Sequence, residues 1–406
     1  MKGIELAGAS RQTYYHSMPQ SWDFSALSPI DPDPIFAITA EAIAAGPSAI
    51  NGTIGVFMDE DGKVAMFPSV KKALEDLKNN LSDVSYSYPA LTGIPEFRSS
   101  IEKLIFGDGQ TVASIASTAG TGALAFNLRL ASLMHPDATV ILSTPAWANH
   151  LPICHANHLH VTDVPYCDIT GKVTIDPIID AAKKATKPVI LLLQVGCHNP
   201  TGLDFSEDQW KELADFFTGR DCLAILDFAY QGFKDEPEKD SWPIRLFAEK
   251  KIPLLVAWSA SKNHSIYGLR CGLSAAVVHD AETKKKIEVY YSRISRGMHS
   301  ASPIFGQRVV ATVQQKYQKE WLDDLAAARK VLVAKRQTMK EHLPKSFQSA
   351  LNGYGMFATL PLSRDQVLQL KNEQKVYLAV DGRLNIAGIH MRRIEEMCEK
   401  IGGIIA

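Results

Sequence analysis

Residues 188–195 read Pro188-Val-Ile-Leu-Leu-Leu-Gln-Val195, a run that is apolar at successive positions. Successive side chains of a strand point to opposite faces of its sheet, so an apolar run without alternation indicates that both faces are covered. Such strands lie in the middle of parallel sheets whose faces are packed with helices. The run therefore predicts an α/β fold and marks the centre of its sheet.

Similar apolar runs occur on both sides of this strand and alternate with helical patterns. They span residues 112–118, 138–144, 223–228, 253–259 and 272–278. This alternation indicates βαβ units and a mainly parallel sheet. After about residue 280 the pattern is helical, with residues 320–339 as one amphipathic helix, and strand-like runs return at 356–360 and 376–379. The late strands predict a separate, smaller α+β piece.

Bulk composition narrows the class of ligand. The 406 residues are 46% hydrophobic and 21% charged, with a formal net charge of -1, which suggests small-molecule ligands and neither a nucleic acid nor a membrane as partner. The six cysteines are scattered without a CxxC pair, and the chain starts without a signal-like apolar run, so we expect reduced thiols and a cytoplasmic location. The aromatic residues in 1–30 suggest an arm that packs on another surface.

Polar residues follow several of the predicted strands, where ligands bind in open α/β sheets. Gly120 and Thr121 open a helix, a suitable site for a phosphate, although a tight turn that binds nothing fits equally well. Asn199 lies in a turn and can present its amide to an acceptor. Asp227 ends an apolar strand, where a buried carboxylate needs a cation or hydrogen-bond donor, and a structural salt bridge would satisfy it.

The most informative segment is Ser259-Ala-Ser-Lys-Asn-His-Ser-Ile-Tyr-Gly-Leu-Arg-Cys-Gly272. It places a lysine between serines just past an apolar strand, with Arg270 eight residues later. A solvated lysine is the usual fate of this residue type. Here two hydroxyl groups and a guanidinium group beside the strand suit a phosphate dianion.

Eight blocks of sequence together resemble one family, the fold type I, class I aminotransferases, in the branch that acts on aspartate and aromatic amino acids. The blocks, from residue 54 to residue 388, are Ile54-Gly-Val56, Tyr88-Pro-Ala-Leu-Thr-Gly-Ile-Pro-Glu-Phe97, Ala119-Gly-Thr-Gly-Ala-Leu124, Pro145-Ala-Trp-Ala-Asn-His150, His198-Asn-Pro-Thr-Gly202, Asp227-Phe-Ala-Tyr-Gln-Gly-Phe233, Ser259-Ala-Ser-Lys-Asn263 with Arg270, and Gly382-Arg-Leu-Asn-Ile-Ala-Gly388. Each block alone is weak, whereas eight in this order are specific. We expect a mostly parallel seven-stranded sheet in a large domain (64–330), a small α+β domain (31–63 plus 331–406) and an N-terminal arm (1–30).

The resemblance implies catalytic roles for three residues and a pyridoxal 5'-phosphate cofactor. Lys262 would hold the cofactor covalently and later move the proton at the substrate α-carbon. Asp227 would pair with the protonated pyridine nitrogen of the cofactor. Tyr230, together with Asn199, would bind the phenolic oxygen, and Trp147 would stack on the ring. His150 would contact Asp227 and not the cofactor itself.

The phosphate would be held by residues from several strand ends. They are Gly120, Thr121, Ser259, Ser261 and Arg270, with Tyr88 reaching in from a second subunit. Ala119 departs from the serine of many relatives, which removes one hydrogen bond without abolishing binding. Because of the contribution from Tyr88, the resemblance implies a homodimer with shared active sites.

The resemblance also implies how a dicarboxylic substrate is held. Arg383 would bind the α-carboxylate, assisted by Gly55, Asn199 and Trp147, and Arg296 would bind the distal carboxylate across the dimer interface. Arg293 lies three residues before Arg296, so a shift of one helical turn would exchange the two.

A less polar rim at Phe57, Met58, Ser87 and Ala301 favours aromatic side chains as well as aspartate, with 2-oxoglutarate as acceptor and L-glutamate as product. The amino donor used in the cell stays open.

Other readings explain less of the sequence. A β-lyase or decarboxylase on the same cofactor has less use for Arg296, and a dinucleotide-dependent dehydrogenase leaves Lys262, Asp227 and Arg383 unexplained. A protein without catalytic activity does not fit the presence of both the lysine and the aspartate. Cys154, His155, His158 and His160 lack the paired spacing of structural zinc sites, so we expect no metal.

Overall fold

The computed structural model describes residues 22, 24–26, 29, 34–59, 61–80 and 88–405. Most of the predicted arm therefore lies outside the described residues, and so does Ser87 of the predicted pocket rim. Trp22 and Phe24, which belong to that arm, are almost fully exposed in this chain. No helix in the described part is both long and apolar enough to cross a membrane.

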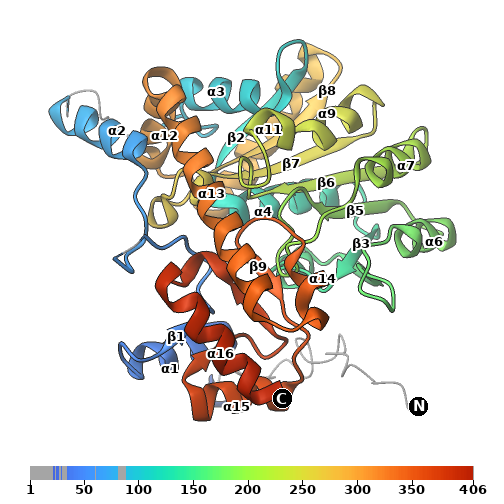
Figure 1. The fold of residues 1–406 in the computed structure, drawn as a ribbon. Helices are drawn as coiled ribbons and strands as arrows, with labels where there is room; N and C mark the ends of the chain where they lie inside the picture. The colour runs from blue at the N-terminus through green and yellow to red at the C-terminus, as the bar shows by residue number, and fades with distance from the viewer. Residues whose placement is uncertain are drawn as a thin grey trace.

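The centre of the molecule is a seven-stranded sheet in the order β2-β8-β7-β6-β5-β3-β4 (Figure 1). Its strands are β2 Thr111–Thr118, β3 Thr139–Thr144, β4 His160–Pro165, β5 Val189–Gln194, β6 Cys222–Phe228, β7 Leu254–Ser259 and β8 Cys271–Val278. β8 runs antiparallel to both of its neighbours, β2 and β7, and the other four strand pairs are parallel. The predicted α/β fold is confirmed, and β5 lies inside the sheet as expected.

The sequence prediction missed one strand of this sheet, β4. This strand forms the edge of the sheet, paired only with β3, and its burial is mostly low. An edge strand with solvent-facing His160 and Asp163 has no continuous apolar run, so its sequence does not differ from that of a loop.

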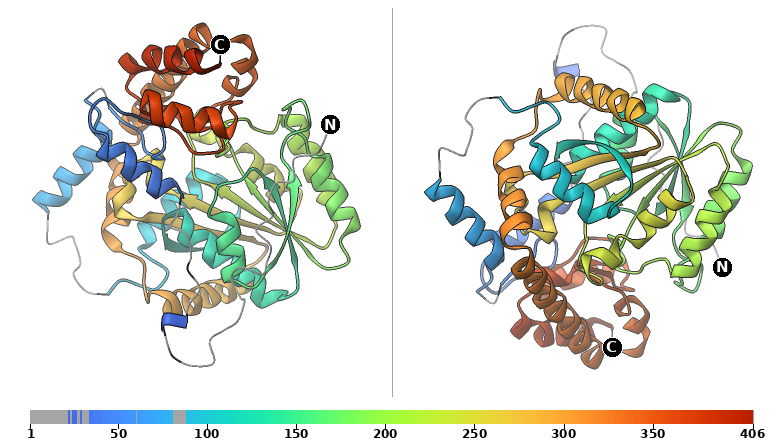
Figure 2. Two further views of the ribbon diagram at one scale, coloured as in Figure 1. Left: turned by 90° about the horizontal axis from the view of Figure 1, so that it is seen from below. Right: turned by 90° about the horizontal axis from the view of Figure 1, so that it is seen from above.

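Helices cover both faces of the sheet (Figure 2). They are α2 Pro68–Asn79, α3 Pro95–Phe106, α4 Ala119–Met134, α5 His150–Ala156, α6 Asp176–Lys184, α7 Glu207–Phe217, α8 Pro237–Asp240, α9 Trp242–Glu249, α10 Ala260–Asn263, α11 Ala281–Met298, α12 Ile304–Lys316 and α13 Gln318–His342. Side chains of α4, α5 and α11 form one core with the sheet, and those of α2, α3, α6, α7, α9, α12 and α13 form the other. Within β6, Ile225 joins the first core, whereas Ala224 and Leu226 join the second, so both faces of this central strand are buried.

The remaining elements gather around a smaller core at one side of the sheet (Figures 1 and 2). They are α1 Pro34–Ala44, β1 Ile50–Asn51, α14 Gln348–Leu351, β9 Phe357–Thr359, α15 Arg364–Gln374, β10 Val376–Tyr377, β11 Arg383–Asn385 and α16 Ile394–Ile405. β1 pairs with β10, and β11 pairs with β9. The long helix α13 connects the two parts, because Trp321 is buried in the larger core and Met339 in the smaller one. The boundaries 31–63, 64–330 and 331–406 stay a prediction.

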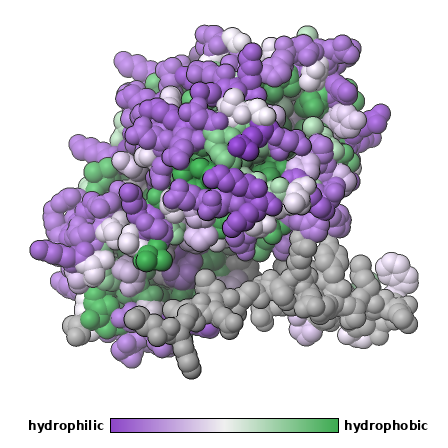
Figure 3. Space-filling model, turned by 90° about the vertical axis from the view of Figure 1, so that its right-hand side faces the viewer, coloured by the Kyte–Doolittle hydropathy of each residue, from purple (hydrophilic) through white to green (hydrophobic). Residues whose placement is uncertain are grey.

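The surface is more polar than these cores. The face in Figure 3 is mostly hydrophilic, with small hydrophobic patches between the polar side chains.

One close approach in the interior requires a glycine, because a Cβ atom on Gly272 would lie 2.6 Å from the carbonyl carbon of Ala119 and 2.7 Å from the Trp258 oxygen. Gly272 therefore allows β8 to run directly beside the start of α4.

Replacing Ile225 by alanine tests whether the side chains of β6 are buried in the core. Ile225 is fully buried, so the substitution should lower the free energy of unfolding by about 2–5 kcal/mol through lost burial and the cavity it leaves. Ile169 is fully exposed, and Ile169→Ala should change the value by less than about 0.5 kcal/mol. Chemical denaturation of both variants would measure this, and equal effects would contradict the assignment of β6 to the core.

Candidate active site

A cavity lies at the carboxyl ends of the parallel strands, next to the start of α4. Its lining consists of Ala119, Gly120, Thr121, Trp147, Gln194, Asn199, Asp227, Ala229, Tyr230, Ser259, Ser261, Lys262 and Arg270. The structure thus brings together in one place the residues predicted to bind the cofactor, with the exception of Tyr88. Gln194 and Ala229 are additional lining residues that the sequence analysis did not predict.

Lys262 is carried by α10, the short helix that follows β7. Its Nζ atom lies 5.2 Å from the centroid of the Tyr230 ring. Burial lowers the pKa of the Lys262 ammonium group, the Asp227 carboxylate raises it and Arg270 lowers it, and the net result of the three is a pKa of about 8. A lysine in this environment therefore has far more neutral amine near neutral pH than an exposed lysine.

Asp227 is the last residue but one of β6 and is buried. Its Oδ2 atom is 2.9 Å from Nε2 of His150, which is also buried. The His150 ring meets the Trp147 ring edge to face, with centroids 5.3 Å apart. His150 thus supplies a hydrogen bond to the carboxylate, and the predicted position of His150 beside Asp227 is what the structure has.

Asn199 and Tyr230, which both line the cavity, contact each other. Nδ2 of Asn199 donates to the Tyr230 hydroxyl over 3.4 Å, whereas the buried Oδ1 atom of Asn199 has no hydrogen-bond partner. Burial and the nearby Asp227 raise the pKa of the Tyr230 hydroxyl, while the Asn199 hydrogen bond and Arg383 oppose the shift. The buried side chains leave one acceptor unpaired at the point where a ligand would lie.

Gln194 explains the shape of the loop that carries Asn199. Its Oε1 atom accepts from the Asn199 backbone N–H over 3.2 Å, and its Nε2 atom donates to the Cys197 carbonyl over 3.3 Å. A polar residue at the end of the apolar run 188–195 was the available signal, but it does not differ from the many glutamines that end strands without a role.

Hydroxyl groups and backbone donors line the part of the cavity next to the start of α4. The Ser259 and Ser261 hydroxyls lie 3.1 Å apart, and a Cβ atom on Gly120 would lie 3.2 Å from the Ser259 Cβ, so α4 begins close against them. Arg270 adopts a left-handed backbone conformation with φ of 50° and is fastened by a bond from its Nη1 to the Tyr267 carbonyl. A helix start with small side chains, two hydroxyls and a guanidinium group form a site for a dianion.

Arg383 and Gly55 lie in the smaller part, on segments that adjoin the cavity. The Arg383 guanidinium carbon is 5.5 Å from the centroid of the Phe357 ring, and a Cβ atom on Gly55 would lie 3.3 Å from that same ring. Asn385, two residues after Arg383, donates to the carbonyls of Ile54 and Val56. One side chain thus connects the strand of Arg383 with the segment of Gly55.

The structure does not bring Arg296, Arg293 or Tyr88 to the Lys262 cavity of the same chain. Arg296 lies on α11, where its Nη1 donates to Ser300 over 3.0 Å. Arg293 and Arg296 border a separate surface cavity beside Leu91 and Thr92, and Tyr88 is 93% exposed. These three side chains face outward in the single chain.

Comparison with known proteins assigns the chain to a family. The sequence pattern described as "Aminotransferase class I and II" matches residues 48–401. The chain belongs to the class I and II aminotransferases. It is 33% identical to the aromatic-amino-acid aminotransferase of Paracoccus denitrificans, over 92% of this chain and 98% of that one. It is 30% identical to the cytoplasmic aspartate aminotransferase of Saccharomyces cerevisiae, over 94% and 97%.

A solved structure resembles this aminotransferase closely in three dimensions. The aromatic-amino-acid aminotransferase of Burkholderia pseudomallei, covalently bound to pyridoxal phosphate, matches with a TM-score of 0.90 and 28% identity, covering 94% of this chain and 99% of that one. The predicted family and its fold type are thereby confirmed. A buried acid, a site for a dianion and a lysine of lowered pKa, which line one cavity, fit this cofactor.

Lys262→Met should make the ligand-free aminotransferase more stable at pH 7, by on the order of 2 kcal/mol, because it removes a desolvated ammonium group. Folding lowers the lysine pKa from 10.5 to about 8, so the penalty is full below pH 8. As the pH rises toward 10.5 the folded lysine loses its proton and the gain disappears. Urea unfolding between pH 7 and 10 tests this, with Lys250→Met, at a surface ion pair with Asp215, as control. A gain that grows with pH would contradict the low pKa.

Proposed function

We propose that this aminotransferase transfers the amino group of an aromatic L-amino acid or aspartate to 2-oxoglutarate, giving a 2-oxo acid and L-glutamate, with pyridoxal phosphate bound covalently to Lys262. The observation that carries the proposal is the placement of Lys262 in one cavity between the buried Asp227 and the dianion site of α4, Ser259, Ser261 and Arg270. Similarity to the aspartate and aromatic enzymes over more than nine tenths of the chain supports it.

Each end of the cavity would hold one end of the cofactor. The Gly120 and Thr121 backbone, the two serines and Arg270 would bind the phosphate, and Asp227 would accept a hydrogen bond from the pyridine nitrogen and keep it protonated. Bound pyridoxal phosphate supplies an electron sink that stabilises negative charge at the substrate α-carbon. His150 would hold the Asp227 carboxylate in place, and Asn199 would donate from Nδ2 to the phenolic oxygen of the cofactor.

Lys262 would act as the base at the α-carbon. Its pKa of about 8 places its neutral form within reach at physiological pH, as general base catalysis requires. Tyr230, whose ring lies beneath the lysine, would bind the phenolic oxygen of the cofactor and keep the amine on one side of the cavity.

The substrate would be held by charge at both ends. Arg383 would bind the α-carboxylate, with Gly55, Asn199 and Trp147 around it. Because Arg296 and Tyr88 face outward from their own chain, we infer that they complete the site of a second subunit in a homodimer, where Arg296 binds a distal carboxylate. Phe57 is buried and Met58 half-buried, which favours a rim that also accepts aromatic rings.

Lys262→Ala should abolish transamination, by at least a thousandfold in kcat, and leave the purified enzyme without the visible absorbance of covalently bound pyridoxal phosphate. Lys250→Ala should keep both. Absorbance spectra and a coupled glutamate assay measure the two properties. A Lys262→Ala enzyme with normal turnover would refute the assignment of this lysine.

Arg296→Met should lower kcat/KM for aspartate by about a hundredfold, because a charge-assisted, bidentate contact is lost, and lower it for phenylalanine far less. Arg293→Met serves as the matched control one helical turn away and should change neither value much. First half-reactions with aspartate, tyrosine, phenylalanine and kynurenine would be compared for both variants. Near-zero turnover of every aromatic donor by the unmodified enzyme would refute the broad specificity.

A further inference from the structure

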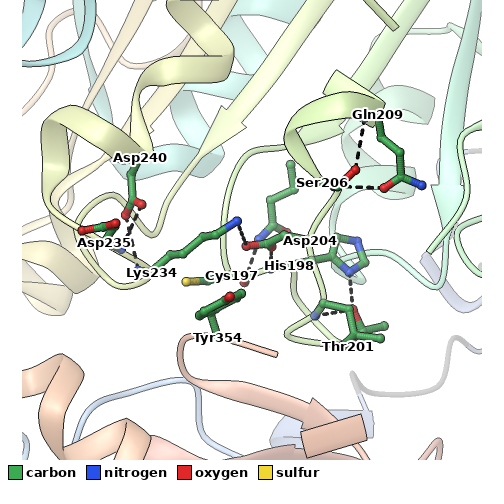
Figure 4. A network of polar contacts seen from close by, with 12 residues as sticks. Cys197, His198, Thr201, Asp204, Ser206, Gln209, Lys234, Asp235, Asp240 and Tyr354 are labelled. Atoms are coloured by element: carbon green, nitrogen blue, oxygen red, sulfur yellow. Dashed lines mark hydrogen bonds and ion pairs between the residues drawn. The ribbon is translucent and has the colours of Figure 1, made fainter. Parts of the chain in front are cut away.

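Two loops carry Asn199 and Tyr230 into the cavity, and Lys234 connects them from outside it. Asn199 follows β5, Tyr230 follows β6, and Lys234 lies four residues after Tyr230 on the same loop. Lys234 does not line the cavity of Lys262. Figure 4 shows its side chain running between Asp204, which belongs to the loop of Asn199, and Tyr354, which belongs to the smaller part of the molecule. One ammonium group thus lies where three segments meet.

The first contact of Lys234 is with a buried carboxylate. Its Nζ atom lies 3.3 Å from Oδ2 of Asp204, whose side chain is only 6% exposed. The other oxygen of Asp204 accepts from the backbone N–H of His198, the residue before Asn199, over 3.1 Å. Burial of Lys234 opposes its charge, but Asp204 outweighs this effect and raises the pKa of the ammonium group. Lys234 is therefore charged at physiological pH, and its ion pair with Asp204 holds the Asn199 loop.

The second contact of Lys234 is with the smaller part. Its Nζ atom lies 4.9 Å from the centroid of the Tyr354 ring, within the range of a cation–π interaction. The backbone N–H of Tyr354 donates to the Gly202 carbonyl over 2.7 Å, and the Thr359 hydroxyl donates to the Pro200 carbonyl over 3.1 Å. The segment 354–359 is thus hydrogen-bonded directly to the Asn199 loop. These bonds lie beside the contact between Lys234 and Tyr354.

This segment leads to the arginine proposed to bind the substrate carboxylate. Thr359 of β9 is the direct partner of Arg383 in β11. A displacement of residues 354–359 from the loop 198–204 would therefore move Arg383 relative to Asn199.

The backbone of Lys234 is itself fixed. The buried Asp240 carboxylate accepts from the backbone N–H groups of Gly232, Lys234 and Asp235, at 2.7, 3.3 and 3.0 Å. This arrangement distinguishes Lys234 from ordinary surface lysines such as Lys250, whose partner Asp215 is 64% exposed. Only the first of the two pairs joins a buried carboxylate near the cavity to another part of the molecule.

We propose that Lys234 is a positioning residue, which sets the place of Arg383 relative to Asn199 and Tyr230 by joining Asp204 to Tyr354. The inference rests on the proposed function, because it takes Arg383 as the carboxylate-binding group. It assigns Lys234 no contact with substrate or cofactor. Loss of the contact should therefore weaken substrate binding more than it slows the chemical step.

Lys234→Met should raise KM for aspartate and 2-oxoglutarate about fivefold, the size expected for one partly buried ion pair and one cation–π contact, and leave kcat within about twofold. Lys234→Arg should keep KM close to that of the unmodified enzyme, because the arginine retains the positive charge. Lys250→Met should have the KM and kcat of the unmodified enzyme. An unchanged KM in Lys234→Met, or a fall in kcat alone, would overturn the proposal.

Lys234→Met leaves the Asp204 carboxylate without its cation, which could raise KM through instability alone. The double variant Lys234→Met/Asp204→Asn removes that charge while the amide oxygen can still accept from His198. We expect it to recover the thermal midpoint of the unmodified enzyme but to retain the raised KM. Recovery of both would show a purely structural role and overturn the proposal.

Hydrogen exchange on the cofactor-free protein tests the contact without any assumption about catalysis. The Tyr354 amide, bonded to Gly202, should exchange several-fold faster in Lys234→Met and in Tyr354→Leu, but not in Tyr354→Phe, which keeps the ring, or in Lys250→Met. Unchanged exchange in Lys234→Met would refute the connection itself. If exchange is faster in Lys234→Met but the unmodified enzyme has no transaminase activity, the contact is real and the proposed function is wrong.

Discussion

The site depends on the burial of the Asp227 carboxylate at the end of an apolar strand. A buried charge is costly unless a partner meets it, and His150 is the side chain that meets Asp227 in the described part of the chain. Asp227 lines the same cavity as Arg270 and the hydroxyl groups of Ser259 and Ser261. A ligand with one cationic and one anionic group satisfies both sets of residues, which is the physical reason that the cofactor of the solved relative fits here.

Lys262 shows the same balance of burial against charge. Desolvation and Arg270 disfavour its ammonium form, whereas Asp227 favours it, and the balance leaves a pKa of about 8. Arg270 and Asp227 line the same cavity as the lysine. Of the two groups that would hold the cofactor, Arg270 therefore helps the lysine to lose its proton, whereas Asp227 opposes that loss.

The loops around the cavity are held by polar side chains. Gln194, which itself lines the cavity, shapes the Asn199 loop, Asp240 holds the backbone after Tyr230, and Asn385 connects the Arg383 strand with residues 54–56. Each of these supports is a side chain that accepts or donates at several backbone groups. Gln194 and Asp240 act within a few residues of their own loops, whereas Asn385 makes the position of Arg383 depend on a segment that is distant in the sequence.

Sequence patterns predicted the α/β class and the six main strands, because central parallel strands are apolar on both faces. The resemblance to a family predicted most of the residues that line the Lys262 cavity. The patterns missed β4, whose polar edge lacks an apolar run, and Gln194, whose role depends on a loop that folds back on it. The resemblance already placed Arg296 and Tyr88 in the site of a second subunit, and only the tertiary structure decided that Lys234 reaches both Asp204 and Tyr354. The physical reason is range: periodicity and turn chemistry are local properties of the chain, whereas these contacts join segments up to about 120 residues apart, whose meeting is determined by the packing of the whole fold.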